Sequence, residues 1–214
     1  MPLIVLEGPE GAGKTTQLAI LAERLRAQGR NVVCLREPGG TPLGDAVRAI
    51  LLDPNQHITP RAEALLFMAS RAQLVNDQIR PALESGAVVL LDRFFLSTYA
   101  YQVRGRGLDE AAIVNANRLA TGGLVPDLTI WLSLPIDEGL ARAARRGEAD
   151  RMERADQDFH ARVAAAFAEF ASAGWQDRHR EAGPIVAVDA NGPREEVAGR
   201  VYRSVAAQLS QLAG

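Results

Sequence analysis

The chain carries 24 basic residues among its 214, and only one of them, Lys14, is a lysine. It lies in Gly8-Pro9-Glu10-Gly11-Ala12-Gly13-Lys14-Thr15, which has the GxxxxGK[ST] spacing of a P-loop. In that motif backbone amides surround a β-phosphate, the ammonium binds β- and γ-oxygens, and the threonine hydroxyl is a Mg²⁺ ligand. A chain that otherwise uses arginine needs a compact ammonium here, which indicates phosphate chemistry.

The segments around this loop have the order that a P-loop requires. The apolar run Leu3-Ile4-Val5-Leu6 precedes it and predicts a buried strand. Helical spacing of apolar residues follows it, at Leu18, Leu21, Ala22 and Leu25. We therefore expect the loop from Gly8 through Thr16 to bind nucleotide phosphates at the start of a helix, with Thr15 as a direct metal ligand.

Length and composition limit the class of protein. A chain of 214 residues suffices for one α/β core, so we expect a single domain over 1–214. The formal charge of −2 gives no general reason to bind nucleic acid or an anionic membrane. A strand starting at residue 3 leaves no room for a signal peptide, and no apolar run approaches the roughly 20 residues of a membrane span, which predicts a cytoplasmic protein. The only cysteine, Cys34, is expected in a strand core.

The order of predicted elements indicates the fold class. Strand-like runs at 3–7, 31–36, 87–92, 127–133 and 184–189 alternate with helical segments. This alternation predicts an α/β fold of three layers, with a five-stranded parallel sheet flanked by helices. A long helical stretch at 61–84 is interrupted at most by Pro81, and two later apolar stripes, at 159–170 and 197–209, are expected in the core.

The third predicted strand ends in Asp92-Arg93. Its carboxyl end should lie beside the P-loop, where open α/β sheets bind ligands. Asp92 can hold the water shell of Mg²⁺, and Arg93 can bridge donor and acceptor phosphates with its guanidinium. Taken alone, such a pair is more often a strand-end salt bridge, but the preceding P-loop strand favours the functional interpretation.

Five segments, in the same order, resemble the bacterial-type thymidylate kinase family over essentially the whole chain. They are Glu7 to Thr16, Arg36 to Thr41, Phe67 with Arg71, Asp92-Arg93 continuing to Leu96 through Gln102, and an arginine-rich segment at 142–153. The resemblance implies a P-loop kinase fold, ATP with Mg²⁺ on the P-loop, and dTMP in a facing pocket. It also implies that the two phosphates meet at Arg93 and that the protein is a homodimer.

The resemblance assigns an acceptor site as well. Phe67 and Arg71 lie four apart on a helix and share a face, where they would stack on thymine and donate to its carbonyl oxygen. Arg36 would reach the acceptor phosphate. The other implied substrate-binding residues are Ser97, Thr98, Tyr101, whose ring would crowd a ribose 2′-hydroxyl, and Gln102. Phe94-Phe95 stand where relatives often carry polar residues, so the local loop contacts should differ.

Further residues are implied to act on the transferred group. Glu10, an unusual carboxylate within a P-loop, would lie near the sugar 3′-hydroxyl and the metal. The P-loop supplies no arginine, and the 142–153 segment carries four around Gly147, with Arg146 and Arg151 at the positions of lid arginines. From the residues alone, this segment is either a solvated helix end or a mobile lid.

We therefore expect transfer of the γ-phosphoryl group of MgATP to the 5′-phosphate of dTMP, giving ADP and dTDP for dTTP synthesis. Lys14, Arg93 and the lid arginines would supply charge, and no general base is needed. Two alternatives stay open: a kinase for another pyrimidine nucleoside monophosphate, and a P-loop regulatory protein that uses ATP as a switch. A guanine-binding switch is disfavoured, because the single lysine leaves no Asn-Lys-x-Asp segment.

Lys14→Arg should abolish transfer nearly as completely as Lys14→Ala, because a guanidinium is too broad for a cradle of backbone amides. The measurement is single-turnover phosphoryl transfer by variants whose folding has been checked by circular dichroism. A Lys14→Arg enzyme that keeps more than about a tenth of the wild-type rate would contradict this interpretation of the loop.

Overall fold

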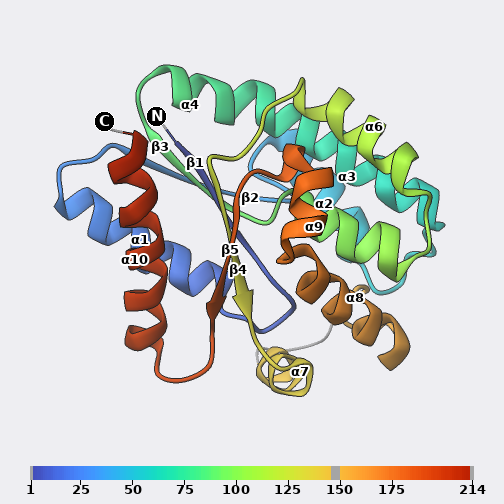
Figure 1. Cartoon of the computed structure of the whole chain (residues 1–214). Helices are drawn as coiled ribbons and strands as arrows, with labels where there is room; N and C mark the ends of the chain where they lie inside the picture. The colour runs from blue at the N-terminus through green and yellow to red at the C-terminus, as the bar shows by residue number, and fades with distance from the viewer. Residues whose placement is uncertain (1, 146–149, 213–214) are drawn as a thin grey trace.

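The computed structural model describes residues 2–145 and 150–212, and a parallel β-sheet lies at its centre (Figure 1). The sheet has five strands in the order β2-β3-β1-β4-β5. These strands are β1 (Leu3–Glu7), β2 (Val32–Arg36), β3 (Val88–Asp92), β4 (Leu128–Ser133) and β5 (Ile185–Asp189). Every strand-like run expected from the sequence corresponds to one of them, so the predicted fold class is confirmed.

Helices cover both faces of the sheet. They are α1 (Lys14–Ala27), α2 (Pro42–Leu52), α3 (Pro60–Leu74), η1 (Val75–Ile79), α4 (Arg80–Glu84), α5 (Phe95–Thr98), η2 (Tyr99–Gly105), α6 (Glu110–Thr121), α7 (Ile136–Ala144), α8 (Gln157–Phe170), α9 (Ala173–Arg178), η3 (Arg180–Ala182) and α10 (Arg194–Leu212). Figure 1 shows α1 and α10 together on one side, with α2, α3, α6 and α8 on the other. The result is the expected three-layer arrangement. Within the described ranges, no helix is long and apolar enough to cross a membrane.

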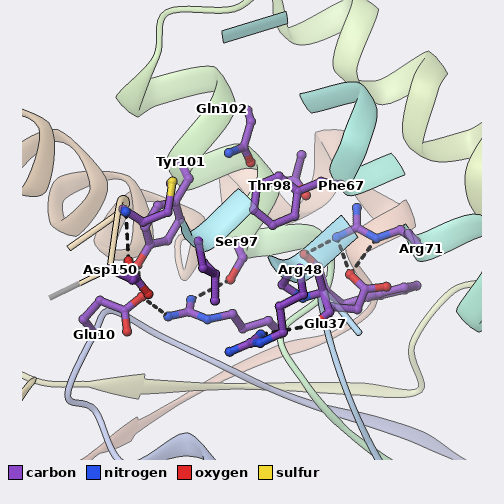
Figure 2. Close-up of a pocket in the computed structure, with 15 residues that line it drawn as sticks. Glu10, Glu37, Arg48, Phe67, Arg71, Ser97, Thr98, Tyr101, Gln102 and Asp150 are labelled. Atoms are coloured by element: carbon purple, nitrogen blue, oxygen red, sulfur yellow. Dashed lines mark hydrogen bonds and ion pairs between the residues drawn. The ribbon is translucent and has the colours of Figure 1, made fainter. Parts of the chain in front are cut away.

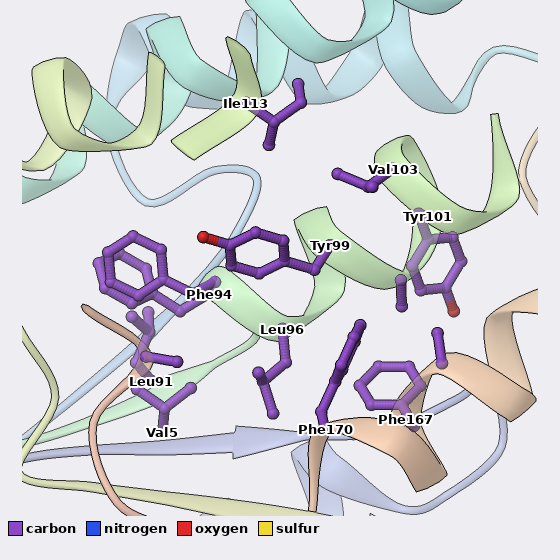
Figure 3. Packing of buried hydrophobic residues seen from close by; sticks show 14 of the residues in the cluster. Val5, Leu91, Phe94, Leu96, Tyr99, Tyr101, Val103, Ile113, Phe167 and Phe170 are labelled. Carbon is purple, nitrogen blue, oxygen red and sulfur yellow. The ribbon is translucent and has the colours of Figure 1, made fainter. Parts of the chain in front are cut away.

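Successive side chains of a strand point to opposite faces of the sheet, so each face of the sheet has its own hydrophobic core. All of β1 is inaccessible to solvent: Ile4 and Leu6 pack in the core beneath α1 and α10, while Leu3 and Val5 enter the opposite core. Figure 3 shows Val5 in this second core, where the aromatic rings of Phe167 and Phe170 from α8 also lie. Both predicted apolar stripes are buried, as expected: Phe159, Val163, Phe167 and Phe170 in α8, and Val197, Val201, Val205 and Leu209 in α10.

The long helical stretch at 61–84 is continuous in space but changes its winding. A π-helical segment, η1, separates α3 from α4, and Pro81 follows it in the first turn of α4. Proline has no amide hydrogen and its ring crowds the carbonyl four residues earlier, so a locally widened helix accommodates it. The sequence predicted an interruption near Pro81, and the structure shows that it is a π-helical segment just before this proline.

The sheet order places the two phosphate-related segments side by side. β1 and β3 are parallel neighbours with Leu6 opposite Asp92, and the Arg93 amide donates to the Leu6 carbonyl at 3.0 Å. The P-loop after β1 and the Asp92-Arg93 pair after β3 therefore leave the same edge of the sheet, as expected. The expectation for Cys34 is wrong: its side chain is exposed, on the edge strand β2.

Candidate active site

Three cavities with shared walls form the candidate site. The Phe67 cavity is lined by Glu10, Glu37, Pro38, Arg48, Leu52, Phe67, Arg71, Arg93, Phe94, Ser97, Thr98, Tyr101, Gln102, Asp150 and Met152 (Figure 2). The Lys14 cavity is lined by Glu10, Gly11, Gly13, Lys14, Thr15, Thr16, Leu18, Cys34, Leu35, Arg36, Glu37, Gly40, Arg48, Asp92 and Arg93. The Arg142 cavity is lined by Gly11, Ala12, Gly13, Thr16, Gln17, Arg142, Ala190, Gly192, Arg194 and Val197. The Lys14 cavity thus lies between the other two.

The P-loop holds Lys14 in a buried position at the start of α1. The ammonium donates to the carbonyl oxygens of Gly8 at 3.0 Å and Pro9 at 2.8 Å. Burial, and secondly the charge of Arg93, lower the pKa of Lys14 from 10.5 to about 8. Gly13, the residue before α1, has a φ of 86°, which residues with a side chain rarely adopt. The loop is therefore arranged around a cation whose charge is maintained at neutral pH.

Thr15 and Asp92, the two predicted metal ligands, are in contact. The Thr15 hydroxyl donates to Asp92 Oδ2 at 2.5 Å, within the Lys14 cavity. Oxygen donors from one carboxylate and one hydroxyl suit Mg²⁺, which takes few protein ligands and completes its octahedron with phosphate oxygens and water. The described residues contain no cluster of three or more histidine, cysteine or carboxylate side chains that could hold a metal by itself. This donor set fits a Mg²⁺ ion that arrives with a nucleotide.

Arg93 lies in the wall between the Phe67 and Lys14 cavities. Its Nη1 donates to Ser97 Oγ at 2.9 Å and to the Gly8 carbonyl at 3.2 Å, and its Nη2 contacts Glu10 Oε1 at 2.5 Å. Burial raises the pKa of Tyr101, whose neutral hydroxyl donates to the same Glu10 oxygen at 3.2 Å. Among the described residues, Arg93 is the only non-glycine with positive φ, at 71°. Such strain persists only where surrounding contacts enforce it.

Glu7 fixes the residues that follow Arg93, and the sequence analysis assigned it no role. It is fully buried; its Oε1 accepts from the amides of Phe94 at 2.7 Å and Ser97 at 3.1 Å, and its Oε2 from the Ser97 hydroxyl at 2.6 Å. Because Ser97 donates to Glu7, its oxygen can accept from Arg93. A carboxylate ending an otherwise apolar strand was the available signal.

Phe67 and Arg71 both line the Phe67 cavity, but Arg71 is bound more fully than expected. Its Nε and Nη2 contact Glu37 Oε2 at 2.8 and 2.6 Å, Nη2 also reaches the Phe94 carbonyl at 2.9 Å, and Nη1 contacts Asn117 Oδ1. Burial raises the pKa of Glu37, while Arg71 opposes that shift. Of the five guanidinium hydrogens, one on Nη1 is left for a ligand.

The other predicted acceptor residues divide between the cavities. Ser97, Thr98, Tyr101 and Gln102 line the Phe67 cavity, and Thr98 and Gln102 are almost fully buried. Arg36 instead lines the Lys14 cavity, where it is exposed and lies 3.7 Å from Asp45. The sequence therefore identified a set of residues that the fold brings to two adjoining cavities.

Arg48 was missed by the sequence interpretation. It lines both the Phe67 and Lys14 cavities, and its Nη1 donates to the Pro38 carbonyl at 3.1 Å. Burial, followed by the charge of Arg36, lowers the pKa of Arg48. A guanidinium that is partly desolvated beside another cation favours an anionic ligand. In a chain rich in arginine, no spacing distinguished this residue from the others.

The predicted lid arginines are placed only in part. Arg146 lies outside the described residues. Arg151 contacts Glu63 with Nη1 at 2.7 Å and the Leu51 carbonyl with Nε at 2.7 Å, and it lines none of the three cavities. Its contact with a transferred phosphate stays a prediction. Arg142, from α7, lines the Arg142 cavity beside the P-loop.

A P-loop, an oxygen-donor metal site and a second cavity across an arginine wall define an α/β P-loop kinase that acts on a small acceptor. The family profile described as thymidylate kinase matches residues 6–198. The chain belongs to the thymidylate kinase family, and it is therefore a kinase. This confirms the resemblance expected from the five sequence segments.

Individual relatives match over almost their whole length. The chain is 50% identical over 202 residues to a thymidylate kinase of Deinococcus radiodurans, covering 94% of this chain and 95% of that protein. It is 50% identical over 205 residues to one from Thermomicrobium roseum, covering 94% and 93%. The crystal structure of thymidylate kinase from Ehrlichia chaffeensis aligns with a TM-score of 0.73 and 30% identity, covering 95% of this chain and 97% of that one.

The lowered pKa of Lys14 predicts a pH dependence for nucleotide binding. Polyphosphate should bind the enzyme whose Lys14 is protonated, and above about pH 8 that fraction falls about tenfold per pH unit. The apparent Kd for ATP should therefore rise above about pH 8, measured by calorimetry between pH 7 and 9.5. Lys14→Met should bind weakly without this inflection, and a wild-type Kd that is flat across the range would contradict the assignment.

Proposed function

We propose that this protein transfers the γ-phosphoryl group of MgATP to the 5′-phosphate of dTMP, giving ADP and dTDP for dTTP synthesis. One observation carries the proposal: Arg93, Arg48 and Glu10 line both the Lys14 cavity and the Phe67 cavity. A donor and an acceptor bound in these two cavities would present their phosphates to the same two guanidinium groups. Family membership supports dTMP as the acceptor.

The donor side would use the Lys14 and Arg142 cavities together. The phosphates of ATP would occupy the P-loop, with Lys14 on the β- and γ-oxygens and backbone N–H groups from Glu10 through Thr16 around them. The nucleoside would extend into the Arg142 cavity, which shares Gly11, Gly13 and Thr16 with the phosphate site. Mg²⁺ would be held by Thr15 directly and by Asp92 through water.

Transfer itself requires charge and alignment. An oxygen of the acceptor phosphate attacks the γ-phosphorus as the bond to the β-bridging oxygen breaks, and ADP leaves with the electron pair. Lys14, Arg93 and Arg48 would balance the charge on the phosphates, together with Arg146 from the lid. Glu10 would hold Arg93 in place before substrates arrive and lie near the acceptor sugar. A phosphate oxygen is already a nucleophile, so no general base is assigned.

The Phe67 cavity has the chemistry expected for thymidine. Phe67 offers a ring for stacking, and Arg71 has one hydrogen left to donate to a carbonyl oxygen. Thr98 and Gln102 would contact the base, and Tyr101, fixed by its hydroxyl on Glu10, would exclude a ribose 2′-hydroxyl. Ser97 acts chiefly through Arg93, and Arg36 would reach toward the acceptor phosphate from the Lys14 cavity.

We also propose that the chain forms one domain, acts in the cytoplasm and assembles as a homodimer. Both hydrophobic cores share one sheet, which supports a single domain. Large apolar side chains are exposed on α2, α3 and α6, which lie together in Figure 1; they are Leu43, Ile50, Leu65 and Leu119. A second copy of the chain would cover this surface. Light scattering after size exclusion would measure the mass, and a monomer at micromolar concentration would contradict the dimer.

The proposed activity predicts that ADP release from ATP depends strongly on the acceptor. We expect rapid release with dTMP and little release without it, measured by a coupled assay under identical MgATP. A panel of dTMP, dUMP and dCMP separates this enzyme from a kinase for another pyrimidine nucleotide. Slow release that ignores dTMP, or that only a protein stimulates, would instead favour a P-loop regulatory protein.

Two substitutions test how the base is recognised. Phe67→Ala should cost about 1–3 kcal/mol of dTMP binding by lost stacking, with ATP binding nearly unchanged. Arg71→Ala should lower kcat/KM for dTMP and narrow the preference over dCMP, because the cytosine amino group repels a guanidinium.

The ratio of kcat/KM for dTMP to that for dCMP is the decisive quantity, since it does not depend on how much variant is folded. This matters because Arg71 also binds Glu37 and Asn117, so its removal disturbs packing. If Arg71→Ala leaves the ratio unchanged, Arg71 does not contact the base, and Thr98 and Gln102 become the candidates.

A further inference from the structure

Glu63 is a fully buried carboxylate that no step of the proposed reaction uses. It lies on α3 and lines none of the three cavities. Its Oε2 is 2.7 Å from Arg151 Nη1 and 3.2 Å from Arg106 Nη2. Its Oε1 accepts from Gln102 Nε2 at 2.9 Å and from Arg106 Nε at 3.2 Å. A buried carboxylate with this many donors fixes the groups around it.

Through Arg151, Glu63 holds the end of the arginine-rich segment at 142–153, where residues 150–153 are described. Arg151 is attached at two further points, since its amide donates to the Leu52 carbonyl at 3.2 Å and its Nε to the Leu51 carbonyl at 2.7 Å. The residues on either side of it, Asp150 and Met152, line the Phe67 cavity. The Arg151 contacts therefore fix one wall of that cavity.

Glu63 also contacts a second wall of the Phe67 cavity, at Gln102. Gln102, from η2, is one of its lining residues and donates to Glu63 directly. Phe67 follows Glu63 by one helical turn on α3, so the two share a face. A single carboxylate thus connects α3, η2 and the 150–152 segment, which together enclose much of the cavity.

The charges indicate what removing this carboxylate would do. Arg151 is 11% exposed and Arg106 23% exposed, and both pair with Glu63. Without the Glu63 carboxylate, the poorly hydrated guanidinium groups of Arg151 and Arg106 repel each other with no anion between them. The 150–152 segment then loses its ion pair with α3. Its attachment should loosen even if the rest of the fold persists.

We propose that Glu63 is a positioning residue, which holds the 150–152 segment against the acceptor cavity through Arg151. On this proposal, and contrary to the expectation from sequence, Arg151 acts as an anchor for the 150–152 segment and does not contact the transferred phosphate. The inference rests on the proposed function for the identity of the acceptor, and on the geometry alone for the anchor.

Glu63→Gln and Arg151→Gln should give the same kinetic pattern. Because Asp150 and Met152 line the Phe67 cavity but not the Lys14 cavity, KM for dTMP should rise about tenfold or more while KM for ATP stays within about twofold. If Arg151 contacted the transferred phosphate instead, Arg151→Gln would lower kcat with KM for dTMP unchanged, and Glu63→Gln would not reproduce it.

The double variant is the sharpest test of this anchor. When two residues act through one contact, their effects do not add, so the Glu63→Gln, Arg151→Gln enzyme should be within about twofold of the worse single variant in kcat/KM for dTMP. A double variant whose loss of kcat/KM equals the product of the two single losses would overturn the proposal. Glu169→Gln is the matched control. It removes a carboxylate that lies 3.0 Å from Arg104 and lines none of the three cavities, so this variant should behave as wild type.

Hydrogen exchange of the substrate-free enzyme tests the anchor without reference to the acceptor. Peptides covering 150–155 should exchange faster in both single variants and unchanged in Glu169→Gln, while peptides of β1 and β3 stay protected. Unchanged exchange at 150–155 in folded Arg151→Gln would overturn the anchor. If Glu63→Gln fails to fold, Arg151→Gln still decides the matter, because Glu63 then retains Arg106. Faster exchange in an enzyme that does not use dTMP would reject the proposed acceptor and keep the anchor.

Discussion

The ion pair between Arg93 and Glu10 is the interaction on which the rest of the site depends. It joins the residue after β3 to the P-loop after β1, at the place where the two cavities meet. Glu7, from inside the sheet, fixes Ser97, and Ser97 receives another hydrogen of Arg93. These contacts hold a backbone conformation that an arginine would not adopt by itself. The guanidinium is consequently aimed before any ligand is bound, so little reorganisation is needed during transfer.

The same region collects cations that would repel one another without nearby carboxylates. Lys14, Arg48 and Arg93 all line the Lys14 cavity, where burial first and a neighbouring arginine second lower the pKa values of Lys14 and Arg48. Glu10 and Asp92 partly compensate, because both act to raise the pKa of Lys14. Polyphosphate and a nucleoside monophosphate bring the negative charge that this arrangement lacks. Ligand binding therefore completes an electrostatic balance that the protein leaves incomplete.

Buried glutamates fix the walls of the Phe67 cavity in a similar way. Glu37 holds Arg71, and Glu63 holds Arg151 and Gln102, in each case from a position out of contact with solvent. These pairs orient long, flexible side chains that would otherwise lose much entropy on binding a ligand. The aromatic core behind them, around Tyr99 and Phe170, gives η2 a rigid support (Figure 3).

The sequence by itself determined the sheet and the P-loop, because these depend on local patterns, and it predicted many of the residues that line the Phe67 and Lys14 cavities. Strand runs alternate with helical periodicity, and Lys14 and Thr15 lie within one motif, so their neighbours are known from spacing. Tertiary structure decided whatever depends on partners distant in sequence. Cys34 is exposed on the edge strand β2, Arg48 of α2 lines both the Phe67 and Lys14 cavities, and Arg151 pairs with a carboxylate of α3. An arginine has the same local signature whether it binds phosphate, pairs with a buried glutamate or faces water, and only the fold distinguishes these environments.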